Sequence, residues 1–111
     1  MKRGFRLSRA ADFKRVRRMG KKIAHPFLAL SALPNDLGAV RVGVMAGKTV
    51  GTAVKRNRAK RVMRAAMQPF LTQIKPGYDI VLIAKGDILE NKSPQVAGAL
   101  AELLRKASLL K

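Results

Sequence analysis

The sequence predicts a single-domain α+β fold, spanning residues 1–111, whose elements follow the order αββαβα. The length of 111 residues is enough for one hydrophobic core and too little for two domains. Hydrophobic residues make up 48% of the chain, which favours a folded domain over a disordered basic tail. Some segments have the apolar pattern of strands, and others have apolar residues three and four positions apart, as helices do. The two kinds of segment succeed one another along the chain, which indicates a fold with both helices and strands.

The first quarter of the chain predicts a basic arm followed by a helix. Residues 1–7 are expected to be a flexible basic arm. Ser8 is the expected N-cap of a helix over Arg9–Met19, and Gly20 is expected to end it. Phe13 lies on a thin apolar stripe of this helix. That stripe leaves two interpretations open: light packing of Phe13 on a sheet, or partial exposure for another purpose.

Two strands are expected next, joined by a short turn. Ile23 to Leu33 reads as one strand, with Pro26 confining its first half to an edge or entry position. The turn residues at 34–38 precede a second strand over Val40–Ala46, in which apolar residues alternate. The short connection predicts that these two strands form an antiparallel hairpin.

The stretch after the second strand predicts an amphipathic helix. Thr52 is a suitable N-cap, and Pro69 is expected to kink or end the helix. The apolar positions have helical spacing: Ala59, Val62, Met63, Ala66, Met67 and Phe70. On a helical wheel Asn57, Arg61 and Arg64 lie on the opposite side. The helix is therefore expected to have one buried face and one basic face.

The last third of the chain predicts an inner strand and a final helix. Ile80–Ala84 is a continuous apolar run, which is typical of a strand covered on both sides. Lys85–Lys92 is expected to be a loop, and Ser93-Pro94 to cap the last helix. The apolar face of that helix is Val96, Leu100, Leu103, Leu104 and Ala107.

The charge of the chain indicates a polyanionic partner. The formal net charge is +18 and the pI is about 11.7. Up to Arg64 there are eighteen Lys/Arg against two acids, a net of 18 − 2 = +16, whereas the remainder carries 6 − 4 = +2. Nucleic acid is the leading partner class, and an anionic membrane surface is second. The chain has no cysteine, no signal-peptide pattern and no membrane-spanning run, so a cytoplasmic location is expected.

The residues offer little support for catalysis by the protein itself. Gly47-Lys48-Thr49 resembles the end of a phosphate-binding loop, but only three residues separate Gly43 from Gly47 where that motif needs four. His25 is the sole histidine, and its position beside a proline favours a structural or solvent-facing role. Asp87 and Glu90 could touch Mg²⁺, although a solvated loop is the favoured interpretation. Any reaction is expected to take place on another component.

The basic helix is difficult to explain by folding alone. Lys60 and Arg64 are four residues apart with no acid nearby, and like charges at this spacing destabilise a helix. Arginine suits bidentate phosphate contacts, and the helix N-terminus is itself an anion site. No helix-turn-helix or zinc finger is recognisable. Phe13 on a basic helix beside a sheet is typical of stacking surfaces for single-stranded RNA, with ordinary packing as the equal alternative.

The segment RVGVMAGKTVGTAVKRNRAKRVMRAA resembles the signature region of the protein subunit of bacterial ribonuclease P, including its RNR motif at Arg56-Asn57-Arg58. The similarity extends to Leu7, Asp12-Phe13, Val16 and Gly20 in the first helix, and to Asp79–Lys85 as the third strand. It covers nearly the whole chain.

This resemblance implies a fold like that of the second domain of ribosomal protein S5, with a mixed sheet and a left-handed β-α-β crossover. It implies an RNA-binding subunit that forms a 1:1 complex with ribonuclease P RNA and binds the single-stranded 5′ leader of precursor tRNA. The RNA would perform hydrolysis with Mg²⁺ bound mainly by the RNA, so no catalytic residue is expected on the protein. The alternative is a non-enzymatic basic RNA-binding module such as a small ribosomal protein.

The resemblance also implies which residues form each site. The RNA contacts would come from the RNR helix and the loop before it: Lys48, Lys55, Arg56, Asn57, Arg58, Lys60, Arg61 and Arg64. A cleft for the leader would be lined by Phe13, Arg17 and Phe27. Family members often carry an aromatic residue where this chain has Arg17, so leader contact is expected to depend more on charge than on stacking. The Gly47-Lys48-Thr49 segment also departs from the family pattern, and metal binding by this loop stays open.

Overall fold

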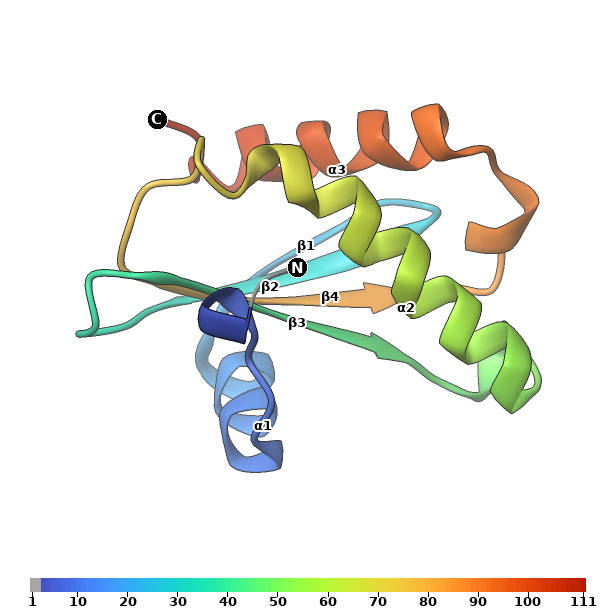
Figure 1. The fold of residues 1–111 in the computed structure, drawn as a ribbon, viewed down its shortest axis with the longest axis horizontal. Helices are drawn as coiled ribbons and strands as arrows, with labels where there is room; N and C mark the ends of the chain where they lie inside the picture. Colours follow the sequence, from blue (N-terminus) through green and yellow to red (C-terminus); the bar gives the residue numbers. More distant parts are fainter. Residues whose placement is uncertain (1–2) are drawn as a thin grey trace.

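The computed structural model describes residues 3–111, which form a four-stranded mixed sheet with helices on both faces (Figure 1). The strands are β1 (Lys21–Ala24), β2 (Leu28–Pro34), β3 (Val40–Ala46) and β4 (Tyr78–Ala84). Their order in the sheet is β1-β2-β4-β3, and only the β3–β4 pair is parallel. The predicted α+β class with a mixed sheet is confirmed.

Three helices complete the fold: α1 (Ala10–Met19), α2 (Ala53–Met67) and α3 (Ser93–Lys106). In Figure 1, α2 and α3 lie above the sheet and α1 lies below it. We call these the upper and lower faces. The parallel strands β3 and β4 are joined through α2, which lies above the sheet, and both strands point to the right in Figure 1 with β4 behind β3. Seen from the side of α2 with the strands pointing up, β4 therefore lies to the left of β3, and the crossover is left-handed. General handedness rules favour a right-handed crossover, and the left-handed one that the resemblance implies is confirmed.

The segment Ile23–Leu33 is not one strand, and this prediction was wrong. It forms the end of β1, a turn at residues 25–27 and most of β2, and the two strands pair as an antiparallel hairpin. Pro26 has no N–H to donate to a ladder, so it occurs in the turn rather than inside a strand. The observed order over residues 3–111 is therefore αβββαβα.

The predicted hairpin between β2 and β3 was also wrong. Strand β4 lies between them, antiparallel to β2 and parallel to β3. The reason is burial. Four consecutive β4 residues, Asp79–Leu82, are fully buried, and a strand covered on both faces is favoured in the middle of the sheet, where both of its edges are paired.

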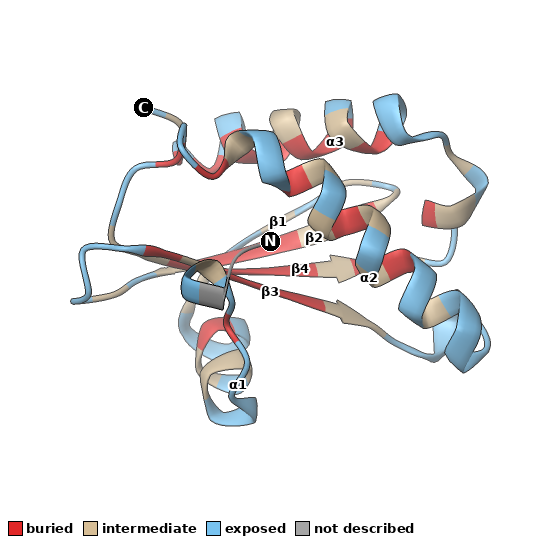
Figure 2. Ribbon diagram, in the orientation of Figure 1, coloured by how far each residue is buried: buried red, intermediate tan, exposed pale blue. Residues whose placement is uncertain are grey.

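The main core lies between the upper face of the sheet and the apolar stripes of α2 and α3. Alternate residues of the strands point into it, among them Leu28, Leu30, Val42, Ile80 and Leu82. Residues predicted as the apolar faces of the two helices are buried there, including Ala59, Met63, Met67, Leu100 and Leu104. Figure 2 shows these red faces turned toward the sheet.

The lower face has a much smaller apolar cluster. Leu7, Val16 and Val81 are buried there, and Phe13 packs against them. Most of the α1 surface is exposed, as Figure 2 shows. Helix α1 therefore covers only part of the lower face.

The ends of the helices were predicted with mixed success. Thr52 caps α2, with its Oγ1 accepting a hydrogen bond from the Lys55 N–H at 3.3 Å, and the helix ends before Pro69. Gly20 follows α1 as predicted. The predicted caps Ser8 and Ser93 were wrong, because the N-cap positions are Arg9 and Lys92. At Lys92 the backbone N–H donates to Gln95 Oε1 at 2.7 Å, so Gln95 supplies the side chain that stabilises this end.

The segment before α1 is attached to the sheet in its described part. Arg6 pairs with Val42 in parallel, and the Leu7 N–H donates to the Val42 carbonyl at 2.9 Å. Leu7 is only 4% exposed. Residues 3–7 therefore follow the edge of β3 instead of forming the predicted flexible arm, and Met1 and Lys2 lie outside the described residues.

Candidate RNA interface

Helix α2 presents an uninterrupted cationic surface on the side opposite the core. Lys55, Asn57, Arg58 and Arg61 are exposed, and Arg56, Lys60 and Arg64 are half-buried. Within residues 3–111, none of the lysines and arginines of this helix forms an ion pair with an acid. The predicted two-faced helix is confirmed, and its contacts with RNA stay a prediction.

The loop before α2 adds a further lysine to this surface. Lys48 is exposed in a single 3₁₀ turn, Lys48–Val50, which is anchored by the buried side chain of Val50. Gly51 follows with φ of 122°, a conformation that glycine adopts without strain. The helix then begins at once, so Lys48 lies beside the N-terminal end of α2, where the helix dipole also favours an anion.

A small cavity lies at the edge of β3, where three cationic residues meet. Its volume is about 260 Å³, and Arg6, Lys60 and Arg64 line it. Burial lowers the pKa of Arg64, and the nearby charge of Arg6 lowers it further. Neither effect neutralises a guanidinium. In residues 3–111 Arg6, Lys60 and Arg64 have no acidic partner, so the protein compensates the positive charge here poorly.

A groove lies on the lower face beside α1, and we call it the lower groove. It consists of two adjoining hollows of about 560 and 460 Å³, which share Lys14 and Arg17. Its floor is formed by small and apolar residues of the strands: Ala29, Ser31, Val44, Met45, Ala46 and Ile83. Its cationic rim is formed by Lys14, Arg17, Arg18, Lys22 and Lys60. Lys60 belongs to α2 as well, so the groove and the helix surface meet at this residue.

Phe13 is both packed against the sheet and partly exposed, the two arrangements that the sequence left open. It is half-buried against the lower cluster, and it also lines both the lower groove and the cavity at the β3 edge. The tip of its ring lies over Gly43, where the strand has no side chain.

Phe27, the third residue predicted for the cleft, lies elsewhere. It packs against the upper core, and its ring meets that of His25 edge-on with centroids 4.8 Å apart. His25 Nδ1 accepts a hydrogen bond from the Phe27 N–H at 3.1 Å, which accounts for the histidine as part of the turn. The structure thus brings Phe13 and Arg17 together and leaves Phe27 apart from them.

Several cationic residues of these surfaces were missed in the sequence. Lys14 and Arg18 are four residues apart on α1, and this spacing could have placed both on one face of the helix. Arg6 and Lys22 gave no such signal, because only the path of the chain brings them to the cavity and the groove.

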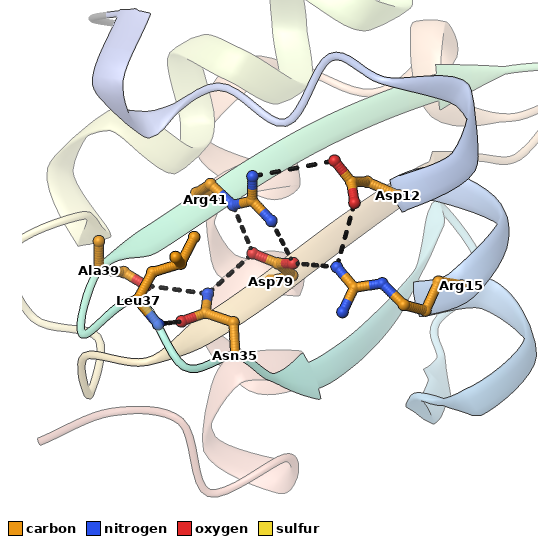
Figure 3. Close-up of polar contacts among 7 residues, drawn as sticks. All are labelled: Asp12, Arg15, Asn35, Leu37, Ala39, Arg41 and Asp79. Carbon is orange, nitrogen blue, oxygen red and sulfur yellow. Dashed lines mark hydrogen bonds and ion pairs between the residues drawn. The ribbon is translucent and has the colours of Figure 1, made fainter.

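A buried carboxylate holds α1 against the sheet (Figure 3). Asp79 of β4 is fully buried on the lower face and accepts hydrogen bonds from Arg41 Nε and Nη2, both at 2.8 Å. Asn35 Nδ2 donates to it at 2.8 Å and Arg15 Nη2, from α1, at 2.9 Å. Arg15 also donates to Asp12 at 3.2 Å. This network fixes the helix that forms one wall of the lower groove.

The charge partners of Asp79 decide its ionisation. Burial raises the pKa of this carboxyl, but the hydrogen bonds from Arg41 and Asn35 and the charges of Arg41 and Arg15 outweigh burial, and the net pKa lies below its usual value. The same contact with Asp79 raises the pKa of Arg41, against the opposing effect of burial. Asp79 is therefore a structural anion and has no proton to exchange near neutral pH.

The structure also bears on a metal site and on membrane-spanning segments. In residues 3–111 no three His, Asp or Glu side chains gather in a way that could hold a metal ion, and this includes Asp87 and Glu90. Across the same residues, each helix is too short or too polar to cross a lipid bilayer.

The comparisons with known proteins agree with one another. The family model for ribonuclease P matches residues 1–108. The ribonuclease P protein component of Herpetosiphon aurantiacus is 39% identical over 98% of this chain and 89% of its own length. That of Chloroflexus aggregans is 37% identical over 99% of this chain and 82% of its own length.

Solved structures show the same fold. The ribonuclease P protein of Staphylococcus aureus superimposes with a TM-score of 0.85 at 26% identity, covering 96% of this chain and 98% of that one. The protein from Thermotoga maritima, solved with 1-(4-fluorophenyl)-2-thiourea, gives a TM-score of 0.81 at 26% identity, covering 91% of this chain and 98% of that one. With the family model matching almost its whole length, the chain belongs to the ribonuclease P protein family.

Proposed function

We propose that this chain is the RNA-binding subunit of ribonuclease P, the enzyme that removes the 5′ leader from precursor tRNA. Family membership implies an RNA partner in the ribonuclease P complex. The surface of α2 and the loop with Lys48 bind the catalytic RNA in this proposal, and the lower groove binds the single-stranded leader. The complex contains one protein and one RNA, and it works in the cytoplasm.

One observation supports this proposal best: the two cationic surfaces are continuous. Lys60 lies on α2 and also lines the lower groove, and Arg64 and Phe13 line the cavity between them. A protein that binds the catalytic RNA through α2 and the leader through the lower groove needs these two surfaces to adjoin. Phosphates of both RNAs would also neutralise the poorly compensated charge around Arg64.

The protein contributes binding and position in this proposal, and the RNA performs the hydrolysis. Mg²⁺ held mainly by the RNA would supply the activated water and stabilise the leaving oxygen. The residues of this chain hold the leader in line with that centre, and correct placement alone can account for a large part of a rate enhancement.

The test is reconstitution at low Mg²⁺. The purified protein is added to its ribonuclease P RNA, and cleavage of precursor tRNA is measured. We expect faster cleavage with the wild-type protein and with Arg105→Ala, whose exposed side chain lies on α3 on the opposite face from the lower groove. The double variant Arg58→Ala/Arg61→Ala is expected to need a higher protein concentration. No stimulation by the wild-type protein would leave the alternative, a non-enzymatic RNA-binding module, as the better description.

A further inference from the structure

Few apolar contacts hold α1 on the sheet. Val16 is the one buried residue of this helix, and Phe13 is half-buried beside it. With only ten residues the helix is too short to be stable by itself, so its position depends on what it meets. Apolar attraction draws the helix to the sheet, but it has no direction and does little to fix the rotation of the helix. The position of α1 must therefore come from directional contacts.

Hydrogen bonds between charged groups supply this direction. Arg15 of α1 donates from Nη2 to Asp79 at 2.9 Å and to Asp12 at 3.2 Å. Asp12, also on α1, lies 3.8 Å from Arg41 Nη1, and Arg41 donates to Asp79 from Nε and Nη2, both at 2.8 Å. The helix and the sheet thus each contribute one cation and one carboxylate. Because such bonds are strong and directional, the two contacts that cross from helix to sheet fix both the distance and the rotation of α1.

Asn35, in the turn between β2 and β3, completes the surroundings of Asp79. Each oxygen of the carboxylate accepts two hydrogen bonds: Oδ1 from Arg41 Nε and Asn35 Nδ2, and Oδ2 from Arg41 Nη2 and Arg15 Nη2 (Figure 3). Asn35 Nδ2 also donates to the Ala39 carbonyl at 3.1 Å. The same amide therefore closes the turn and orients the carboxylate that binds Arg15.

The residues of this network do not line the lower groove. They are Asp12, Arg15, Asn35, Arg41 and Asp79, and none of them borders either hollow of the groove or the cavity at the β3 edge. The residues of α1 that border both hollows are Lys14 and Arg17. Any effect of the network on an RNA in the groove must therefore pass through the position of α1.

From these observations we infer that Arg15 and Asn35 are positioning residues of the leader site, which set the position of α1 through Asp79 without touching RNA. The inference rests on the proposed function, because it takes the precursor leader as the occupant of the groove. It extends the site to a turn residue on a different element. Asn35 has no charge, so its contribution cannot come from neutralising a phosphate.

The experiment compares the binding of precursor and mature tRNA. The complex of protein and ribonuclease P RNA is titrated with both RNAs over a series of salt concentrations, at a temperature at which denaturation curves show every variant folded. Arg15→Met keeps a long apolar side chain but has no donor, and Asn35→Ala removes the amide. Each is expected to weaken precursor binding by roughly three- to thirtyfold, the size of effect that residues along a coupled network have, with mature tRNA unchanged.

The salt dependence separates positioning from direct contact. Arg17→Ala removes a cation of the groove itself and should flatten the slope of log K against log salt for the precursor by about 0.7. Arg15→Met should leave that slope unchanged, because every cation of the groove is retained. Arg15→Lys should restore precursor binding, since Arg15 bonds both carboxylates through one nitrogen and lysine offers one charged nitrogen. Asp36→Asn, at the exposed residue next to Asn35, is the matched control and should bind both RNAs like wild type.

The outcomes distinguish this inference from the function on which it rests. Wild-type precursor binding by both Arg15→Met and Asn35→Ala would overturn the inference and leave the proposed function intact. A flattened slope for Arg15→Met, with normal binding by Asn35→Ala, would overturn it as well, because Arg15 would then contact the leader itself. Equal losses for precursor and mature tRNA would mean that the network supports only the fold. If the wild-type complex binds precursor no tighter than mature tRNA, the leader-binding part of the proposed function is wrong, and the inference is overturned with it.

Discussion

The ring of Phe13 fills the space that a side chain at Gly43 would need. A Cβ atom at residue 43 would lie 2.4 Å from Phe13 Cζ and 2.5 Å from Cε1, closer than two carbon atoms approach. Residue 43 faces the lower side of β3, so α1 can approach the strand this closely only because glycine has no side chain. The glycine therefore sets the position of Phe13 and, with it, one wall of the lower groove.

Gly43→Ala should displace α1 and lower the free energy of unfolding. The added methyl group meets an aromatic ring that other residues hold in place, and overpacking of this kind costs about 1–3 kcal/mol. Urea denaturation measures the change. Gly98→Ala is the matched control: this glycine lies inside α3 with no atom within 4 Å of an added Cβ, so alanine should stabilise by about 0.5–1 kcal/mol. Equal stability of Gly43→Ala and wild type would contradict the contact.

Asp79→Asn should destabilise the protein strongly near neutral pH. The substitution removes the buried carboxylate that Arg41 and Arg15 share and leaves Asp12 as their remaining acid, and each hydrogen bond to a charged group contributes about 1.5–3 kcal/mol. Asp36→Asn, at an exposed acid in the β2–β3 turn, is the control and should have little effect. Equilibrium denaturation of both variants tests the network in Figure 3.

The destabilisation of Asp79→Asn relative to wild type should disappear at acidic pH. The pKa of Asp79 is lower in the folded state than in the unfolded chain, so its contribution is complete above the ordinary aspartate pKa and disappears as the pH falls through the folded value. The difference in unfolding free energy between wild type and Asp79→Asn should therefore shrink as the pH decreases into that range. A difference that stays constant would mean that the charge of Asp79 is not what stabilises the fold.

Binding of the ribonuclease P RNA should depend steeply on salt. If about six cationic side chains of α2 and its loop contact phosphates, log K against log salt should have a slope of roughly −4 to −5. Arg58→Ala or Arg61→Ala should each flatten it by about one unit, and Arg105→Ala should not. A slope near zero for the wild type would refute the phosphate contacts.

Phe13→Leu should separate the two roles of this residue. Leucine retains much of the packing against the lower cluster but has no ring on which a base can stack. We expect weaker binding of precursor tRNA, by about 1 kcal/mol or more, with binding of mature tRNA unchanged. Titration of both RNAs measures the difference, and an equal loss for the two would show that Phe13 acts only through packing.

Thr52→Ala should remove the N-cap of α2 and cost about 1 kcal/mol of stability. Ser93→Ala provides the comparison, because Ser93 is already inside α3 and its side chain caps nothing. Thermal or chemical denaturation of the two variants should rank Thr52→Ala as the less stable.

The sequence alone was sufficient for the features that depend on local patterns. Spacing of three and four placed Met63 and Met67 in the core and the arginines of α2 outside, because helix geometry fixes which residues share a face. The continuous apolar run at Ile80–Ala84 identified the inner strand, because a strand covered on both faces is apolar on both. The signature around Arg56-Asn57-Arg58 indicated the family, and the comparisons confirmed it.

Only the tertiary structure decided which distant residues meet. No local pattern places Asp79 against Arg41 and Arg15, because these contacts depend on the entry of β4 between β2 and β3. The same topology brings Lys22 and Lys60 to one groove and moves Phe27 to the other face. Periodicity determines the face of each element, and packing between elements, which depends on the whole chain, determines what that face meets.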